Sequence, residues 1–98
     1  MTEAQAPRLD ADGTLAFPCR WPLKAMLQAE HDSADRRQAV LDVLHALEGA
    51  PDLGGVQQRA SRNGRYASLT VEVQARSRDH LEQLYAAVRE LDGVVMTL

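Results

Sequence analysis

The sequence predicts an α+β fold in which the elements follow the order strand, helix, strand, strand, helix, strand. Two observations carry this prediction. The Asn63-Gly64 dipeptide separates two stretches of strand character, and it favours a hairpin because both positions accept positive φ at little cost. Ser33 and Ser77 each precede a stretch whose apolar residues have helical spacing, as helix N-cap residues do. A hairpin between two helices indicates one sheet covered by those helices.

The first strand is predicted over Trp21–Leu27 and the first helix over about residues 34–48. Alternate positions of the strand are apolar, as expected of a strand with one buried face: Trp21, Leu23, Ala25 and Leu27. The helix begins after Ser33, and its apolar positions follow the three-and-four spacing: Val40, Val43, Leu44 and Leu47. Gly49 followed by Pro51 predicts its end.

Residues 56–62 and 65–75 are predicted to pair across the Asn63-Gly64 turn. The second of these strands alternates cleanly, which predicts one buried and one hydrated face. Its apolar positions are Ala67, Leu69, Val71, Val73 and Ala75. A two-residue turn places Arg62 opposite Arg65 and Arg59 opposite Ser68.

The second helix is predicted to begin after Ser77 and to be ended by Gly93. One stripe of this helix is apolar: Leu81, Leu84, Tyr85, Val88 and Leu91. Residues 94–98 form the last strand. Two split βαβ units with right-handed crossovers then close into a ferredoxin-like βαββαβ sandwich, a four-stranded antiparallel sheet in the order 4-1-3-2 with both helices on one face.

Composition favours one small intracellular domain. The 98 residues carry a formal net charge of -3, which argues against a general affinity for nucleic acid or for an anionic membrane. The single cysteine, Cys19, cannot form an internal disulfide. Residues 1–16 lack periodicity and the features of a signal peptide, so we expect a flexible lead-in, a single domain over residues 17–98 and a cytoplasmic location without membrane partners.

Three segments resemble the YbeD-like family of small bacterial proteins of unknown function: FPCRWPLKAM at 17–26, SRNGRYASLTVEVQARS at 61–77 and VVMTL at 94–98. The resemblance implies a ferredoxin-like domain similar to ACT regulatory domains, which bind small metabolites and associate in pairs. It also implies a loose link to lipoate metabolism in some bacteria, and it implies no catalytic residues. The chain departs from the family at two positions: Leu27 stands where relatives commonly have glycine, and Arg20 stands where many have an acid. Residues 28–32 contain no glycine, whereas ACT domains often have a glycine-containing loop between the first strand and the first helix, which weighs against an ACT-type amino-acid site.

No motif indicates an enzyme or a cofactor. The sequence has neither a nucleophile elbow nor a phosphate-binding loop. The three histidines show no metal-ligand spacing, and a weak divalent site at His31, Asp32 and Asp35 is a minor alternative to carboxylates that favour the start of a helix. Cys19 is interpreted as a packing residue, the alternative being a thiol activated by Arg20.

The arginines give the clearest indication of a binding site. Positions 59–78 contain one acid, Glu72, and five arginines: Arg59, Arg62, Arg65, Arg76 and Arg78. One interpretation is that these side chains simply extend into water, where screening weakens their repulsion. The other is that the hairpin meets an anion or an acidic partner. For the second interpretation the candidate residues are Lys24, Arg59, Arg62, Arg65 and Tyr66.

The hypothesis is therefore a non-catalytic regulatory or protein-interaction module that binds a protein partner or a small anionic metabolite. Met26 and Tyr66 on the uncovered sheet face further predict a weak homodimer. One alternative is an ACT-type metabolite sensor, with the ligand at a subunit interface near the starts of the helices. A weaker alternative is an RNA-contacting domain that uses Tyr66 and the arginines, although the second aromatic of an RNA-binding sheet is missing.

Overall fold

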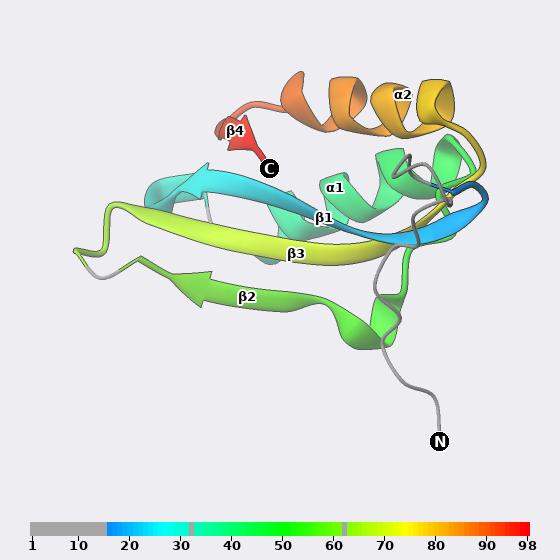
Figure 1. Ribbon diagram of the computed structural model, residues 1–98. Helices are drawn as coiled ribbons and strands as arrows, with labels where there is room; N and C mark the ends of the chain where they lie inside the picture. The colour runs from blue at the N-terminus through cyan, green and yellow to red at the C-terminus, as the bar shows by residue number, and fades with distance from the viewer. Residues whose placement is uncertain (1–15, 32, 62) are drawn as a thin grey trace.

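The computed structural model describes residues 16–31, 33–61 and 63–98, and it shows a four-stranded sheet with two helices on one face (Figure 1). The predicted lead-in of residues 1–16 therefore lies outside the described residues up to position 15. The elements in chain order are β1 (Cys19–Gln28), η1 (Ala29–His31), α1 (Ala34–Ala46), η2 (Leu53–Gly55), β2 (Gln57–Ala60), β3 (Tyr66–Ala75), α2 (Arg78–Arg89) and β4 (Val94–Thr97).

The sheet is antiparallel with the order β2-β3-β1-β4, which confirms the predicted arrangement. The two central strands pair without interruption from Cys19 opposite Ala75 to Gln28 opposite Tyr66. In the hairpin Arg59 lies opposite Ser68, as the two-residue turn predicts. The predicted pair of Arg62 and Arg65 lies outside the described residues because it includes position 62.

One face of the sheet is buried under the helices. The odd positions of β3 expose at most 2% of their surface, and β1 contributes Leu23, Ala25 and Leu27 to the same side. A single core cluster joins these strands to Val40 and Leu44 of α1 and to Leu84 and Val88 of α2. Both helices must therefore cover the same face. Burial of this apolar surface is the main stabilising contribution.

Both predicted serine caps are present. The Ser33 Oγ accepts a hydrogen bond from the Arg36 N–H at 3.1 Å, and the Ser77 Oγ accepts one from the His80 N–H at 3.0 Å. Helix α1 ends at Ala46 rather than at the predicted 48, because Glu48 turns the chain with a φ of 63°. Gly49 then fits between the Leu44 carbonyl oxygen and the Leu84 side chain, where a Cβ atom would lie 2.9 Å and 3.0 Å from them.

Strand β2 is shorter than the predicted 56–62. Near the turn, side chains replace part of the backbone pairing, although the Ser61 N–H still donates to the Tyr66 carbonyl at 2.7 Å. The Ser61 Oγ accepts from the Tyr66 N–H at 3.0 Å, and the Asn63 Oδ1 accepts from the Arg65 N–H at 3.1 Å. The Gly64 N–H donates to the Ser61 carbonyl at 3.1 Å, and Gly64 has a φ of 74°. Regular pairing therefore stops at Ala60, and the turn is held by its own side chains.

Two polar side chains, the buried His80 and the partly buried Tyr85, connect elements that lie far apart in the sequence. His80 is 4% exposed, its Nδ1 accepts from the Arg76 N–H at 3.0 Å, and its Nε2 lies 2.8 Å from the Leu47 carbonyl. Because Nδ1 accepts, Nε2 is the donor in this arrangement. The Tyr85 hydroxyl accepts from the Trp21 Nε1 and donates to the Leu98 carbonyl, both at 2.6 Å.

Candidate functional site

The open face of the sheet is the face that the helices leave uncovered. Side chains alternate along a strand, so the even positions of β1 and β3 lie on this face opposite the buried odd positions. The pairing registers then place Gln57 and Arg59 of β2, and Met96 of β4, on the same side. The open face thus gathers side chains from every strand, including Lys24 and Tyr66 of the predicted site.

A hollow of about 440 Å³ lies on the open face above the middle of β3. Thr70 lies opposite Lys24 on one side and opposite Gln57 on the other, so a short side chain is flanked by two longer ones. The same holds one step along the strand, where Ser68 lies between Met26 and Arg59. The residues that line the hollow are Lys24, Gln57, Gln58, Arg59, Ser68 and Thr70.

A second, smaller hollow of about 100 Å³ continues the first toward the turn of the hairpin. The two hollows share Arg59 and Ser68. The smaller one has a more apolar lining, which includes Met26, Ala60 and Tyr66. Together the two hollows form one depression along β3, which we call the β3 groove: its floor is Ser68 and Thr70, and its walls come from β1 and β2.

Two cations, Lys24 and Arg59, lie on opposite walls of the β3 groove. Within residues 16–31, 33–61 and 63–98, no ion pair joins Lys24 or Arg59 to a carboxylate. The acid nearest along β3, Glu72, contacts Arg20 instead, with 3.5 Å between Nε and Oε1. Arg20 also donates to the carbonyl oxygens of Ala50 and Glu72, each at 3.4 Å. The described lining of the groove therefore holds two positive charges, one ammonium and one guanidinium group.

The groove chemistry suits an anion. A guanidinium presents a planar fork of donors, an ammonium is a compact charge, and the serine and threonine hydroxyls of the floor can each donate one more hydrogen bond. Donors from three strands can thus converge on one carboxylate or phosphate. Among the residues that line either hollow, none is a carboxylate or an imidazole that could act as a general base.

The structure brings together Lys24, Arg59 and Tyr66 of the five predicted site residues. Arg65 is exposed in the turn and lines neither hollow, while its carbonyl accepts from the Ala29 N–H at 2.9 Å. Arg62 lies outside the described residues. The hydroxyls of Ser68 and Thr70 were not among the predicted site residues, although their place opposite Lys24 and Met26 follows once the register of β1 against β3 is known.

Cys19 lies on the buried side, at 7% exposure, packed with Ala75 and Leu81. Burial raises the pKa of the Cys19 thiol, which disfavours the reactive thiolate. The Arg20 side chain extends to Glu72 on the other face, so it does not activate the sulfur. In the part of the chain that the structure describes, no cluster of three or more histidine, cysteine or acidic side chains has a metal-binding arrangement. The alternative site at His31 cannot be assigned there, because Asp32 lies outside the described residues.

No helix in the described ranges has the length and apolar character needed to cross a bilayer. A family model described as "Protein of unknown function (DUF493)" matches residues 12–98 of the chain. Among curated proteins, a UPF0250 protein from Shewanella amazonensis is 34% identical over 89% of this chain and 93% of its own. One from Nitrosomonas europaea is 35% identical over 89% and 97%, and one from Hahella chejuensis is 31% identical over the full length of both chains.

Solved structures share the fold at low sequence identity. The solution structure of protein HP0495 from H. pylori superimposes with a TM-score of 0.64 at 17% identity, covering 98% of both chains. The C-terminal domain of the MgtC protein from Mycobacterium tuberculosis gives a TM-score of 0.62 at 10% identity, covering 81% of this chain and 82% of that one. At these identities the likeness extends to the arrangement of strands and helices alone.

Proposed function

We propose, from the geometry of the open face, that this protein is a non-catalytic regulatory module that recognises an anionic group. The chain belongs to the DUF493 family, whose function is unknown. Family membership confirms the YbeD-like resemblance seen in residues 17–26, 61–77 and 94–98. The link to lipoate metabolism that the resemblance implies stays a prediction, because no group in the β3 groove is specific for it.

The observation that carries the proposal is the pair of cations, Lys24 and Arg59, on opposite walls of the β3 groove without a described acidic partner. Two like charges over one hollow repel each other, and an anion between them removes that repulsion. The energetic gain is larger when several donors converge than when one exposed pair forms, because a single surface ion pair contributes little. The hydroxyls of Ser68 and Thr70 supply the additional donors.

Two further features support recognition rather than chemistry. The groove lining provides ammonium, guanidinium, amide and hydroxyl groups, which bind anions, and its described residues include no cysteine, histidine or carboxylate. The site also lies on paired strands of a sheet, so the backbone positions from which its donors extend are fixed when the ligand is absent. A preorganised anion site of this kind suits a module that responds to a metabolite or to an acidic group of a partner.

An NMR titration with inorganic pyrophosphate tests the proposal. In the wild-type protein we expect saturable shifts of the backbone amide signals of Lys24, Arg59, Ser68 and Thr70. The Lys24→Gln/Arg59→Gln double variant should lose saturation while keeping a folded spectrum. Arg78→Gln is a matched control for Arg59→Gln, because it removes the same charge from α2 on the helix-covered side. Equal dissociation constants for wild type and the double variant would overturn the proposal.

A further inference from the structure

The β3 groove has two chemically different ends. The larger hollow is polar and lies between Lys24 and Arg59, whereas the smaller hollow lies against Met26 and Tyr66. Arg59 and Ser68 belong to both hollows, so a single molecule can occupy both. Resting on the proposed function, we infer that the ligand is an aryl anion: an aromatic group joined directly to a phosphate or carboxylate.

The spacing of residues along the strands determines where the ring and the anionic group of the ligand lie. The row of Lys24 and Thr70 lies two residues from the row of Met26 and Ser68, which is a separation of about 7 Å along the strand. This distance matches one aromatic ring with its attached anionic group, and it is too short for a long flexible chain between them. The anion lies beside Lys24, and the ring lies over Ser68.

The side chains around Ser68 favour an aromatic ring over other apolar groups. Tyr66 is 37% exposed and closes the groove toward the turn, where its ring can stack with or contact the edge of another ring. The Met26 thioether provides a polarisable sulfur, which contacts ring edges favourably. The Arg59 guanidinium can lie over a ring face while its donors reach the anion.

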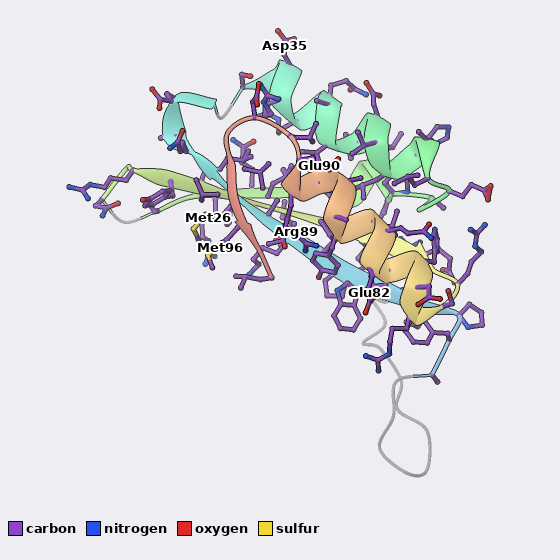
Figure 2. All side chains as sticks on the ribbon, turned by 90° about the horizontal axis from the view of Figure 1, so that it is seen from above. Met26, Asp35, Glu82, Arg89, Glu90 and Met96 are labelled. Carbon is purple, nitrogen blue, oxygen red and sulfur yellow. The ribbon has the colours of Figure 1, made fainter. Side chains whose placement is uncertain are left out.

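The apolar end of the groove extends beyond Met26 to the neighbouring strand. Met26 lies opposite Met96 in the register of β1 and β4, and Figure 2 shows the two side chains next to each other. Met96 is 47% exposed, so its thioether adds to the apolar surface beside the smaller hollow. The apolar side chains that can contact the ring thus lie at the end of the groove near the turn, whereas the ammonium of Lys24 lies at the polar end.

The test compares phenyl phosphate, inorganic phosphate and phenol by NMR titration of the full chain. We expect phenyl phosphate to bind at least tenfold more tightly than inorganic phosphate, and phenol to bind more weakly than phenyl phosphate. Tyr66→Ser should reduce the ratio of the phenyl phosphate affinity to the inorganic phosphate affinity to about one. Tyr66→Phe, which keeps the ring, should keep the advantage. The Lys24→Gln/Arg59→Gln variant should weaken the binding of both phosphates.

The outcomes separate this inference from the proposed function. Equal affinity of the wild type for phenyl phosphate and inorganic phosphate overturns the inference and leaves the anion site in place, as does an advantage that survives in Tyr66→Ser. Absence of binding by both phosphates overturns the inference and the proposed function together. A peptide carrying phosphotyrosine distinguishes the two sources of an aryl phosphate. Tighter binding of the peptide than of phenyl phosphate assigns the ligand to a partner protein, and equal binding assigns the ligand to a free small molecule. Either result supports the inference.

Discussion

The two faces of β3 differ in burial and in chemistry. On the helix-covered face Leu69 and Val71 are 1% and 0% exposed, and every odd position of the strand belongs to the core. On the open face Ser68 and Thr70 lie between longer neighbours and form the floor of a groove. Because stability depends on the first face, the second is free to carry charges and hydroxyls that stability does not require. The comparison supports the proposal that the open face carries the binding site.

A second contrast lies within the open face. Arg20 forms an ion pair with Glu72 and hydrogen bonds with two backbone carbonyls, so its charge is compensated within the protein. Lys24 and Arg59, on the same face, have no such partner among the described residues. The labelled charged side chains of the helix layer, among them Asp35, Glu82 and Glu90, lie on the other side of the sheet (Figure 2). Among the described residues, the groove thus differs from the Arg20 end of the sheet in having cations that form no ion pair.

The largest expected effect comes from placing the same charge on each face of β3. Leu69→Asp should unfold the domain, because an unpaired carboxylate in the core costs at least about 3 kcal/mol in addition to the lost apolar contacts. Thr70→Asp, one residue away, should change the free energy of unfolding by less than about 1 kcal/mol and abolish anion binding, because its carboxylate lies between Lys24 and Arg59. Circular dichroism during thermal unfolding measures the stability of both variants, and the pyrophosphate titration measures anion binding by Thr70→Asp. A folded Leu69→Asp protein with wild-type stability would contradict the assignment of the faces.

The next largest expected effect on stability concerns His80, a buried residue of α2. His80→Ala should lower the free energy of unfolding by about 1–3 kcal/mol, because it leaves the Arg76 N–H and the Leu47 carbonyl without their hydrogen bonds. His45→Ala is the matched control, since His45 is exposed on α1. Urea unfolding of both variants gives the comparison. Equal stabilities of the two variants would show that the His80 contacts contribute nothing measurable.

A smaller effect separates the paired cation from the unpaired ones. Arg20→Gln should lower the free energy of unfolding by up to about 1 kcal/mol, because Glu72 loses its partner in a half-buried position. Arg59→Gln should leave it unchanged or raise it by a few tenths of a kcal/mol, because it relieves repulsion from Lys24. Urea unfolding at low and moderate salt distinguishes them. A loss of stability in Arg59→Gln as large as that in Arg20→Gln would mean that Arg59 has a structural role.

Much of the fold could be predicted because its signals are local. The alternation of β3, the serine caps and the Asn63-Gly64 turn each lie within a few residues, and together they allow few topologies. Three features could not be predicted in this way. The groove depends on the register of Lys24 opposite Thr70, the histidine contact depends on a carbonyl at Leu47, and the early end of β2 depends on side-chain hydrogen bonds in the turn.

The smallest expected effect concerns a paired cation at the rim of the molecule. Arg76 forms an ion pair with Glu48, and both side chains are more than half exposed, at 57% and 67%. The hydrogen bond from Arg76 lowers the pKa of Glu48 below the ordinary value of 4.5, and the opposite charge adds to this effect. Because the pKa is lower in the folded state, the stabilisation is present above the ordinary glutamate pKa and is lost as the pH falls through the lowered value. Arg76→Gln should return the pKa of Glu48 toward its ordinary value, as measured by an NMR titration of the Glu48 carboxyl carbon, whereas Lys24→Gln should leave it unchanged. A Glu48 pKa that stays low in Arg76→Gln would show that another group holds this carboxylate in its charged form.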